Sequence, residues 1–354
     1  TAFNQKYKEG VIMKNKLITV STIAAVVGMS MSLPATASMS LRASFADAAL
    51  SIDAWGSQSS SSGFLQTDIA AGSTVLGVYL YSSDVWGGGV AGDVTLNGTF
   101  LSSATGSLLP SGNPVHTNVY DVTSFMKSAI ESSAGGVQNW SISENGFTDG
   151  EVLVVAYQNA STVGGTAIIL DGGLSTGGDN IHLGFAAPYV SGDAFMSLAS
   201  SFSYGDSQYT TVDVTTSSTG ARHLTSSAGG NDDGGFEGTD GALITAGGIG
   251  DNPLNPSDPL LHGASYDDEL YNLALGNGVN ATPFLQAGDT FVNLTTINPS
   301  NDDNVFGLFF TSSFQITDVI ITPPPVPEPE TYAMLLAGLG LLGFMARRRK
   351  ESVA

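Results

Sequence analysis

Carboxylates on glycine-rich loops are the side chains of this sequence best suited to chemistry. They gather with asparagine in three stretches, over residues 231–240, 251–258 and 301–304. Calcium takes about six to eight oxygen ligands from carboxylates, amides and carbonyls on loops that fold around the ion. The alternative is that these residues form Asx turns between strands. The residues that we predict as calcium ligands are Asp232, Asp233, Asp240, Asp302 and Asp303.

Other patterns that carry catalysis in known enzymes fail here on their context. The stretch 173–177 (GLSTG) has the spacing of a nucleophile elbow, but a strand follows where a hydrolase needs a helix. Paired carboxylates hydrolyse glycosides, yet among so many acids the sequence selects no pair. We therefore predict no catalytic residue, no enzyme activity and no cofactor besides calcium. Zinc is not expected, because no two histidines have ligand spacing: His116, His182, His223 and His262.

Charge is distributed very unevenly along the chain. The 354 residues include 11 basic and 32 acidic residues, for a formal net charge of −21. Between residues 38 and 322 the only basic residues are Arg42, Lys127 and Arg222, whereas all but four of the acids lie there. Because nucleic acids and anionic membranes attract basic surfaces, we predict that this body binds neither. Its acids either attract divalent cations or keep an exported protein soluble.

The N-terminal residues predict a signal peptide over 13–37. A lysine-containing start precedes an apolar stretch over 17–31, and an A-x-A cleavage motif follows. We expect signal peptidase to cleave this motif, which Ala35 and Ala37 form. An uncleaved anchor is the alternative, but the apolar stretch is short and ends in proline and small residues.

Residues 1–12 precede Met13, which is the better start of translation. Residues 8–10 can be encoded by a purine-rich string at the distance expected of a bacterial ribosome-binding site. We therefore interpret residues 1–12 as an untranslated leader.

The C-terminal end has three parts. The proline-rich stretch over 323–331 predicts a stiff, extended linker. Residues 332–346 are apolar and helix-prone, and at about 1.5 Å per residue they reach roughly 22 Å. A membrane core is about 30 Å thick, so this sorting helix is short for a permanent anchor. The basic end over 347–354 is expected to stay cytoplasmic.

This tail resembles the PEP-CTERM sorting signal. The match rests on a V-P-E-P box, a small-residue helix over 335–343 and a basic end. The resemblance implies an exosortase partner, transient anchoring in the inner membrane, and delivery to the surface or extracellular matrix of an exopolysaccharide-producing bacterium. The residues that carry the match are Val326, Pro327, Glu328, Pro329, Arg347, Arg348 and Arg349.

The body predicts an all-β fold of the sandwich or jelly-roll type. Short runs of β-branched and aromatic residues alternate with glycine, serine, asparagine and aspartate clusters. One short helix is expected to begin near Thr123 and end at Gly135, apart from the signal helix and the C-terminal apolar helix. Cysteine is absent, so burial must stabilise the fold.

We expect two β-sandwich lobes, over residues 38–175 and 176–322. Residues 119–123 (VYDVT) resemble residues 211–215 (TVDVT), and this similarity would mark equivalent strands of the two lobes. One continuous sandwich is the alternative.

The leading hypothesis for function is a non-catalytic structural or adhesive role at the cell surface or in the biofilm exopolysaccharide. One alternative is a calcium-dependent carbohydrate-binding module. Another is a glycoside hydrolase or lyase, which would need a cleft that holds two carboxylates, one with a raised pKa. The aromatic residues that could stack on sugars, unless they are buried in a core, are Trp55, Trp86, Trp140, Tyr79 and Tyr81.

Overall fold

The computed structural model divides the chain into a body over residues 36–325 and a second unit made of the two terminal segments. In the second unit it describes only residues 337–339 and 342, which are helical. None of the helices described is long and apolar enough to cross a membrane. In the body, the described residues are 39–57, 61–85, 91–110, 115–174, 177–201, 209–228, 243–258, 260, 269–298 and 304–322.

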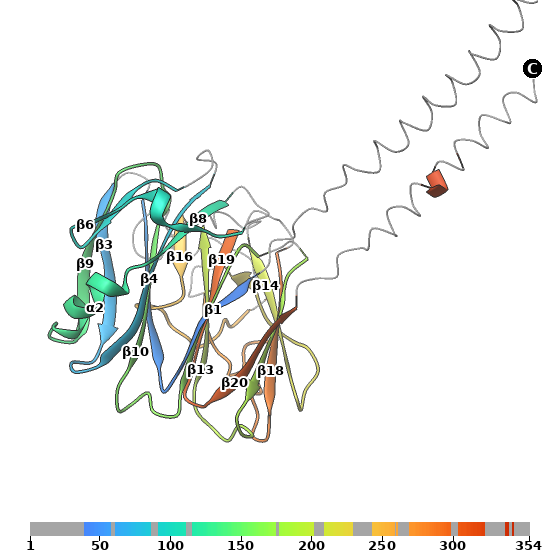
Figure 1. Cartoon of the computed structure of the whole chain (residues 1–354). Helices are drawn as coiled ribbons and strands as arrows, with labels where there is room; N and C mark the ends of the chain where they lie inside the picture. Colours follow the sequence, from blue (N-terminus) through green and yellow to red (C-terminus); the bar gives the residue numbers. More distant parts are fainter. Residues whose placement is uncertain are drawn as a thin grey trace, which may run out of the picture. The chain divides into compact units, whose positions relative to one another are not determined.

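Four antiparallel sheets build the body, and we number them in the order in which they stack (Figure 1). Sheet 1 has the strand order β3 (Ser62–Ile69), β9 (Gly136–Glu144), β5 (Val94–Leu96) and β6 (Thr99–Leu101). Sheet 2 has the order β2 (Ala49–Gly56), β10 (Gly150–Gln158), β4 (Thr74–Val85), β8 (Val115–Asp121) and β7 (Ser107–Leu108).

The other two sheets come mainly from the second half of the chain. Sheet 3 has the order β1 (Ser40–Ala46), β11 (Thr166–Asp171), β19 (Asn304–Ser312) and β13 (Ala194–Ser201), and β13 then pairs with both β16 (Ile244–Ala246) and β17 (Leu270–Asn272). Sheet 4 has the order β15 (Arg222–Ala228), β14 (Thr210–Thr216), β18 (Phe291–Ile297), β12 (Asn180–Phe185) and β20 (Ile316–Thr322).

The strand orders identify two jelly rolls. We leave the two-residue β7 out of the strand count and count β16 and β17 as one position, so that each roll has eight strands. In sheets 2 and 3 the first strand of each roll then lies beside the eighth, then the third and the sixth. In sheets 1 and 4 the second strand lies beside the seventh, then the fourth and the fifth. This is the connection of two Greek keys in a jelly roll, so the all-β, jelly-roll prediction is confirmed. The first roll runs from β2 to β10, and the second from β11 to β19.

The rolls do not divide where the sequence suggested, between residues 175 and 176. β11 is already the first strand of the second roll, and β1 pairs with it, Phe45 opposite Ala167. The crossover is therefore the connection over residues 159–165. The proposed sequence echo also fails, because residues 119–121 lie in the sixth strand of the first roll and residues 211–215 in the fourth strand of the second.

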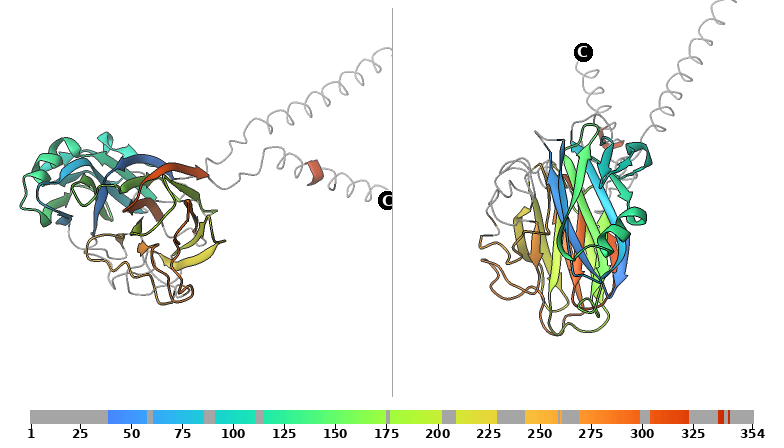
Figure 2. Two further views of the ribbon diagram at one scale, coloured as in Figure 1. Left: turned by 90° about the horizontal axis from the view of Figure 1, so that it is seen from below. Right: turned by 90° about the vertical axis from the view of Figure 1, so that its left-hand side faces the viewer.

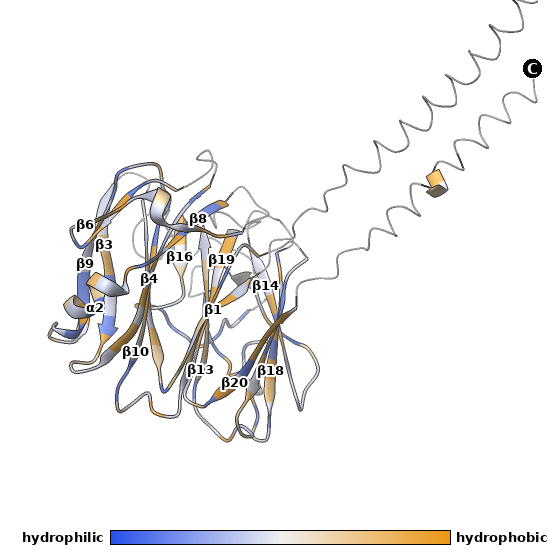
Figure 3. Ribbon diagram, viewed as in Figure 1, coloured by the Kyte–Doolittle hydropathy of each residue, from blue (hydrophilic) through white to orange (hydrophobic). Residues whose placement is uncertain are grey.

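Three hydrophobic cores hold the four sheets together. One core lies between sheets 1 and 2 around Leu80 and Leu153, and another between sheets 3 and 4 around Leu170 and Leu294. The third core joins sheets 2 and 3, with Phe306 among its members. Because sheets 2 and 3 are covered on both faces, β10 and β11 are almost continuously buried and apolar, as Figure 3 shows in part. Two further views of the stack are given in Figure 2.

Helix α2 (Thr123–Glu131) is the expected helix, with different ends. Met126 and Ile130 are buried against the first core. The N-cap residue is Val122, which offers no side-chain cap, and Asp121 Oδ1 instead accepts from the Thr123 N–H at 3.0 Å. The helix ends at Glu131 rather than at Gly135, whose φ of 77° belongs to the turn into β9. The turn requires a glycine there, because a positive φ is strained for other residues.

Candidate functional sites

The predicted calcium ligands and cleavage residues lie outside the described residues. Within the described part of the body, no three acidic or histidine side chains are arranged to hold a metal ion. Asp251, from the middle acidic stretch, accepts a hydrogen bond from the backbone N–H of Gly248. Calcium binding therefore stays a prediction. The predicted residues outside the described ranges are Ala35, Ala37, Asp232, Asp233, Asp240, Asp302, Asp303, Val326, Pro327, Glu328, Pro329, Arg347, Arg348 and Arg349.

The aromatic side chains proposed for sugar stacking do not form an exposed row. Trp55 and Trp140 belong to the core between sheets 1 and 2. Tyr81 is fully buried between sheets 2 and 3, and Tyr79 packs half-buried against that core. Trp86 lies outside the described residues. Four of the five therefore stabilise the cores, and any sugar site must be built from other residues.

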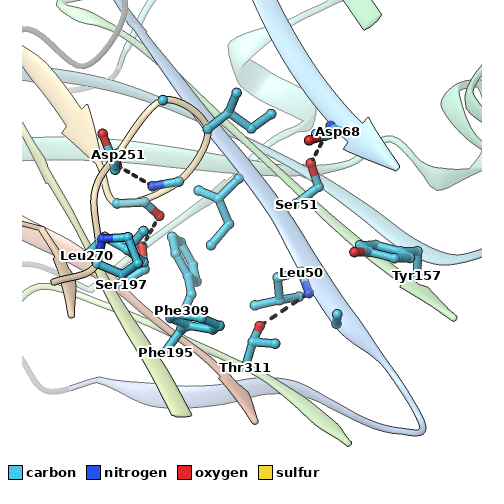
Figure 4. A pocket seen from close by; sticks show the side chains of 17 residues that line it. Leu50, Ser51, Asp68, Tyr157, Phe195, Ser197, Asp251, Leu270, Phe309 and Thr311 are labelled. Atoms are coloured by element: carbon cyan, nitrogen blue, oxygen red, sulfur yellow. Dashed lines mark hydrogen bonds between the residues drawn. The ribbon is translucent and has the colours of Figure 1, made fainter. Parts of the chain in front are cut away.

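A cleft opens between the two jelly rolls, which we call the inter-roll cleft (Figure 4). Its volume is about 440 Å³, and this falls in the range of small-molecule sites. The first roll contributes residues 49–52 of β2, with Asp68 and Tyr157. The second roll contributes Phe195, Phe309 and the loop over 247–253.

The loop over 247–253 positions one side of the cleft. Its Ile249 N–H donates to the carbonyl of Ile52 at 3.0 Å, which ties the second roll to the edge strand β2 of the first. Gly248 lies so close that a Cβ atom there would come 2.2 Å from the Ile52 carbonyl oxygen. A glycine is therefore required for this approach. The Ser197 hydroxyl donates to the Gly247 carbonyl at 2.6 Å and fixes the other end of the turn.

The described lining of the cleft combines apolar side chains with polar groups and carries no positive charge. The described residues that line it include the carboxylates of Asp68 and Asp251 and no lysine, arginine or histidine. Burial, with a smaller contribution from Asp68, raises the pKa of Tyr157, so its phenol stays protonated and able to donate. The Thr311 hydroxyl accepts from the Leu50 N–H at 3.3 Å. This lining suits a neutral or cationic molecule with apolar faces and hydrogen-bond donors.

The three basic residues of the body are all engaged elsewhere. Arg42 of β1 forms an ion pair with Asp171 of β11. Lys127 forms an i,i+4 ion pair with Glu131 within α2, at 3.6 Å. Arg222 donates to backbone carbonyls over 282–284 and lies over a phenylalanine ring at 4.6 Å. Buried carboxylates elsewhere must therefore be stabilised by something other than lysine or arginine.

A cluster of carboxyl groups lies at one end of the interior of the first roll, and we call it the acid cluster. Asp84 is near the end of β4, Asp149 and Glu151 are at the start of β10, and Glu144 ends β9. The Ser82 hydroxyl donates to Glu151 Oε1 at 3.2 Å, whereas Glu151 Oε2 has no hydrogen-bond partner. Sequence analysis missed the cluster, although a glutamate at the head of a buried apolar strand was a usable signal.

Burial raises the pKa values of three carboxyl groups of the acid cluster. It raises the pKa of Asp149 to about 7, and repulsion from Asp84 and Glu144 adds to the effect. Burial, followed by repulsion from Glu144, raises the pKa of Glu151 well above its usual range. Burial also raises the pKa of Glu144. His116 Nδ1 stands 3.6 Å from Asp84 Oδ1. The cluster can therefore hold protons near neutral pH.

One Ser–His–Asp chain of hydrogen bonds occurs on sheet 4. Asp213 Oδ1 lies 2.8 Å from His223 Nδ1, and His223 Nε2 lies 2.8 Å from Ser226 Oγ. This is the order of a serine hydrolase triad, but Ser226 is only 7% exposed. The sequence did not indicate it, because Asp213 comes from the neighbouring strand and the β14–β15 pairing is irregular. The serine of the GLSTG stretch, Ser175, lies outside the described residues.

Residues 325–350 match the family model described as the PEP-CTERM protein-sorting motif. The chain carries a PEP-CTERM tail. It is therefore an exported protein, anchored transiently in a membrane and targeted to an exosortase. The match begins where the body ends, so the function of the two jelly rolls has to be inferred from the rolls themselves.

No curated protein matches the chain. Among solved structures, the major capsid protein P2 from bacteriophage PM2 is similar over 76% of this chain and 98% of its own, at 10% identity. The TM-score is 0.20, and a likeness at that level carries no argument.

Proposed function

We propose that this PEP-CTERM protein has a non-catalytic structural or adhesive role at the cell surface or in the exopolysaccharide matrix. The observation that carries the proposal is the sorting tail, because it directs the two jelly rolls out of the cell. The acidic body, with no basic surface for nucleic acid or membrane, agrees with work in the extracellular space.

The outer face of sheet 1 supports an adhesive role. Its side chains are mostly hydroxyls and amides, and Gln66 donates to Asn139 across the strands at 2.8 Å. Two rings stand out from this face, Phe64 at 59% and Phe100 at 58% exposure. A broad face of this kind suits contact with a hydrated polymer, and exposed aromatic rings are frequent at binding surfaces.

Burial of the reactive groups supports a role without catalysis. Glu151 of the acid cluster is fully buried, and the Ser226 hydroxyl is nearly so. A glycoside or an ester would need to bring its reacting atom within about 3.5 Å of one of these groups. Neither the Glu151 carboxyl nor the Ser226 hydroxyl lines the inter-roll cleft.

A processing experiment tests the proposal. The full chain is expressed in a bacterium that has an exosortase, and the membrane, surface, matrix and medium fractions are blotted with an antibody against the body. We expect a shortened chain in the surface or matrix fraction. Pro327→Ala with Glu328→Ala should leave the uncleaved chain in the membrane, whereas the neighbouring control Glu330→Ala should be processed normally.

The adhesive part needs a second readout in the same strains. Cells that lack the protein should retain less polysaccharide in their attached layer than cells that express it. Normal polysaccharide retention without the protein, or a mature chain found only in the medium, would contradict the proposed role.

A further inference from the structure

We propose that the inter-roll cleft binds a short stretch of neutral oligosaccharide. This inference deepens the proposed function, on which it rests for the claim that the body meets glycans outside the cell. The binding site is the cleft, and the ligand is a polyhydroxylated molecule without negative charge.

The shape of the cleft suits an elongated ligand. Beyond its main volume it continues into a smaller hollow of about 160 Å³, and the two share Ala49, Tyr157, Phe195 and Thr311. The hollow extends to Asp193 at the start of β13. Together they form a groove along the junction of the rolls, open to solvent, in which several sugar units can lie end to end.

The cleft exists because the packing between the rolls ends there. The third core joins sheets 2 and 3 through Ile52, Ala54 and Phe309, but Leu50 and Tyr79 at its border are only half-buried. Twisted sheets that pack face to face diverge toward their corners. At this corner the loop over 247–253 contacts β2 at Ile52 and leaves the space beside residues 49–51 unfilled.

The walls offer both kinds of contact that a sugar ring needs. Two half-buried rings reach the cleft, Phe195 from the second roll and Tyr157 from the first, whereas Phe309 beside Phe195 is buried in the third core (Figure 4). Aromatic rings pack against the apolar face of a pyranose. Sugar hydroxyls donate hydrogen bonds, and the carboxylates of Asp68 and Asp251 are acceptors of the stronger, charge-assisted kind.

The charge of the groups that line the groove determines which sugars can bind there. Every ionisable group that lines the groove in the described residues is an acid or a tyrosine, with Asp193 as the third carboxylate. No arginine or lysine lines it in the described residues, and the three of the body are engaged in other contacts. A uronate or phosphate would therefore be repelled, and a neutral glycan fits.

The test is a calorimetric titration of the full chain in mild detergent with defined tetrasaccharides. The neutral probes are cellotetraose, mannotetraose and N-acetylchitotetraose, and the anionic probe is tetragalacturonate. We expect at least one neutral probe to bind with a dissociation constant of about 1 mM or tighter, and tetragalacturonate to bind at least about tenfold more weakly. Hydrogen exchange should slow over residues 247–251 when the neutral probe is bound.

Matched variants locate the site. Asp68→Asn should weaken binding by about tenfold, because a charge-assisted hydrogen bond is lost. Its control is Asp318→Asn, an exposed carboxyl on sheet 4, which should bind as the original chain does. Phe195→Leu tests the aromatic wall and should also weaken binding, with the melting temperature measured to verify folding.

Three results would overturn the proposal: no neutral probe binds, tetragalacturonate binds as well as the neutral probes, or protection appears away from residues 247–251. If sugar binding fails while processing and polysaccharide retention are normal, the cleft is not a sugar site and the proposed function still stands. If processing is lost while sugar binding is intact, the cleft proposal stands and the proposed function does not.

Discussion

The two jelly rolls share one topology but stabilise their buried acids in different ways. In the first roll, burial raises the pKa of Asp53 and Asp149 to about 7, and few donors face them. In the second roll, burial also acts on Asp289, but hydrogen bonds from Gln286, Ser217 and Ser218 outweigh it and lower its pKa. The fold therefore tolerates buried acids either by keeping them protonated or by surrounding them with donors.

Two rolls of the same topology therefore differ in the electrostatics of their buried acids. The second roll also holds Asp171, which binds Arg42 and accepts from the Tyr81 hydroxyl at 3.0 Å. Because Tyr81 belongs to sheet 2, this acid also links the rolls. The stability of the first roll should depend on protonation of its buried carboxyl groups. In the second roll, hydrogen-bond donors and an ion pair stabilise the charged carboxylates, so its stability should be less sensitive to pH.

The largest expected effect is that of pH on the first roll. Unfolded aspartates titrate near 4, so between about pH 4 and 7 the folded chain binds more protons than the unfolded chain. The stabilisation that each of these carboxyls contributes should be fully present below pH 4. It should be lost as the pH rises through 7, by at most roughly 4 kcal/mol per carboxyl. Calorimetry should show a lower melting temperature at pH 8 than at pH 5, and the opposite order would contradict the comparison.

Asp171→Asn should have the next largest effect. It leaves Arg42 without its ionic partner in a partly buried site, and we expect a loss of about 3 kcal/mol in the free energy of unfolding. The control is Glu131→Gln at the half-exposed pair with Lys127, which keeps an acceptor for the Val75 N–H and should cost less than about 1 kcal/mol. Urea unfolding measures both, and equal losses would show that the Asp171 pair has no special weight.

Two matched substitutions should act with opposite signs at pH 8. Asp149→Asn removes a charge that burial disfavours and keeps an acceptor for the Val85 N–H, so it should stabilise the chain by about 1–2 kcal/mol. Asp289→Asn weakens several charge-assisted hydrogen bonds and should destabilise it by about 1–2 kcal/mol. If both substitutions change the free energy of unfolding in the same direction, the two rolls do not differ in how they stabilise their buried acids.

The smallest expected effect concerns calcium. The predicted ligands fall in the connections from β15 to β16 and from β18 to β19, so they belong to the second roll by sequence. Calcium at tenfold its dissociation constant should add about 1.4 kcal/mol, and a chelator should lower the melting temperature by a few degrees. A melting temperature that a chelator leaves unchanged, with magnesium as the control ion, would end the calcium prediction.

Local patterns were enough to predict the jelly-roll class and the sorting tail. The alternation of buried and exposed residues in β3 can be read from the sequence without tertiary structure. The same holds for the V-P-E-P box with its apolar helix and basic end. The boundary of the rolls was not readable, because β10 and β11 are both uninterrupted buried runs and nothing local assigns them to different sheets.

The sites were less predictable than the fold. The cleft depends on a loop over 247–253 meeting a strand nearly two hundred residues earlier, and no local signal reports such a contact. The acid cluster was closer to prediction, since Glu151 heads an apolar strand, but its burial depends on β4 and β9 as well. Trp55 and Trp140 were offered for sugar binding, and they lie in a core because large aromatics dominate cores.

The most direct test of the proposed role is equilibrium binding of the full chain to purified exopolysaccharide of its host, with calcium and then with a chelator. We expect saturable binding in calcium that Asp68→Asn weakens and Asp318→Asn does not. No binding in either condition would contradict an adhesive role in the polysaccharide matrix.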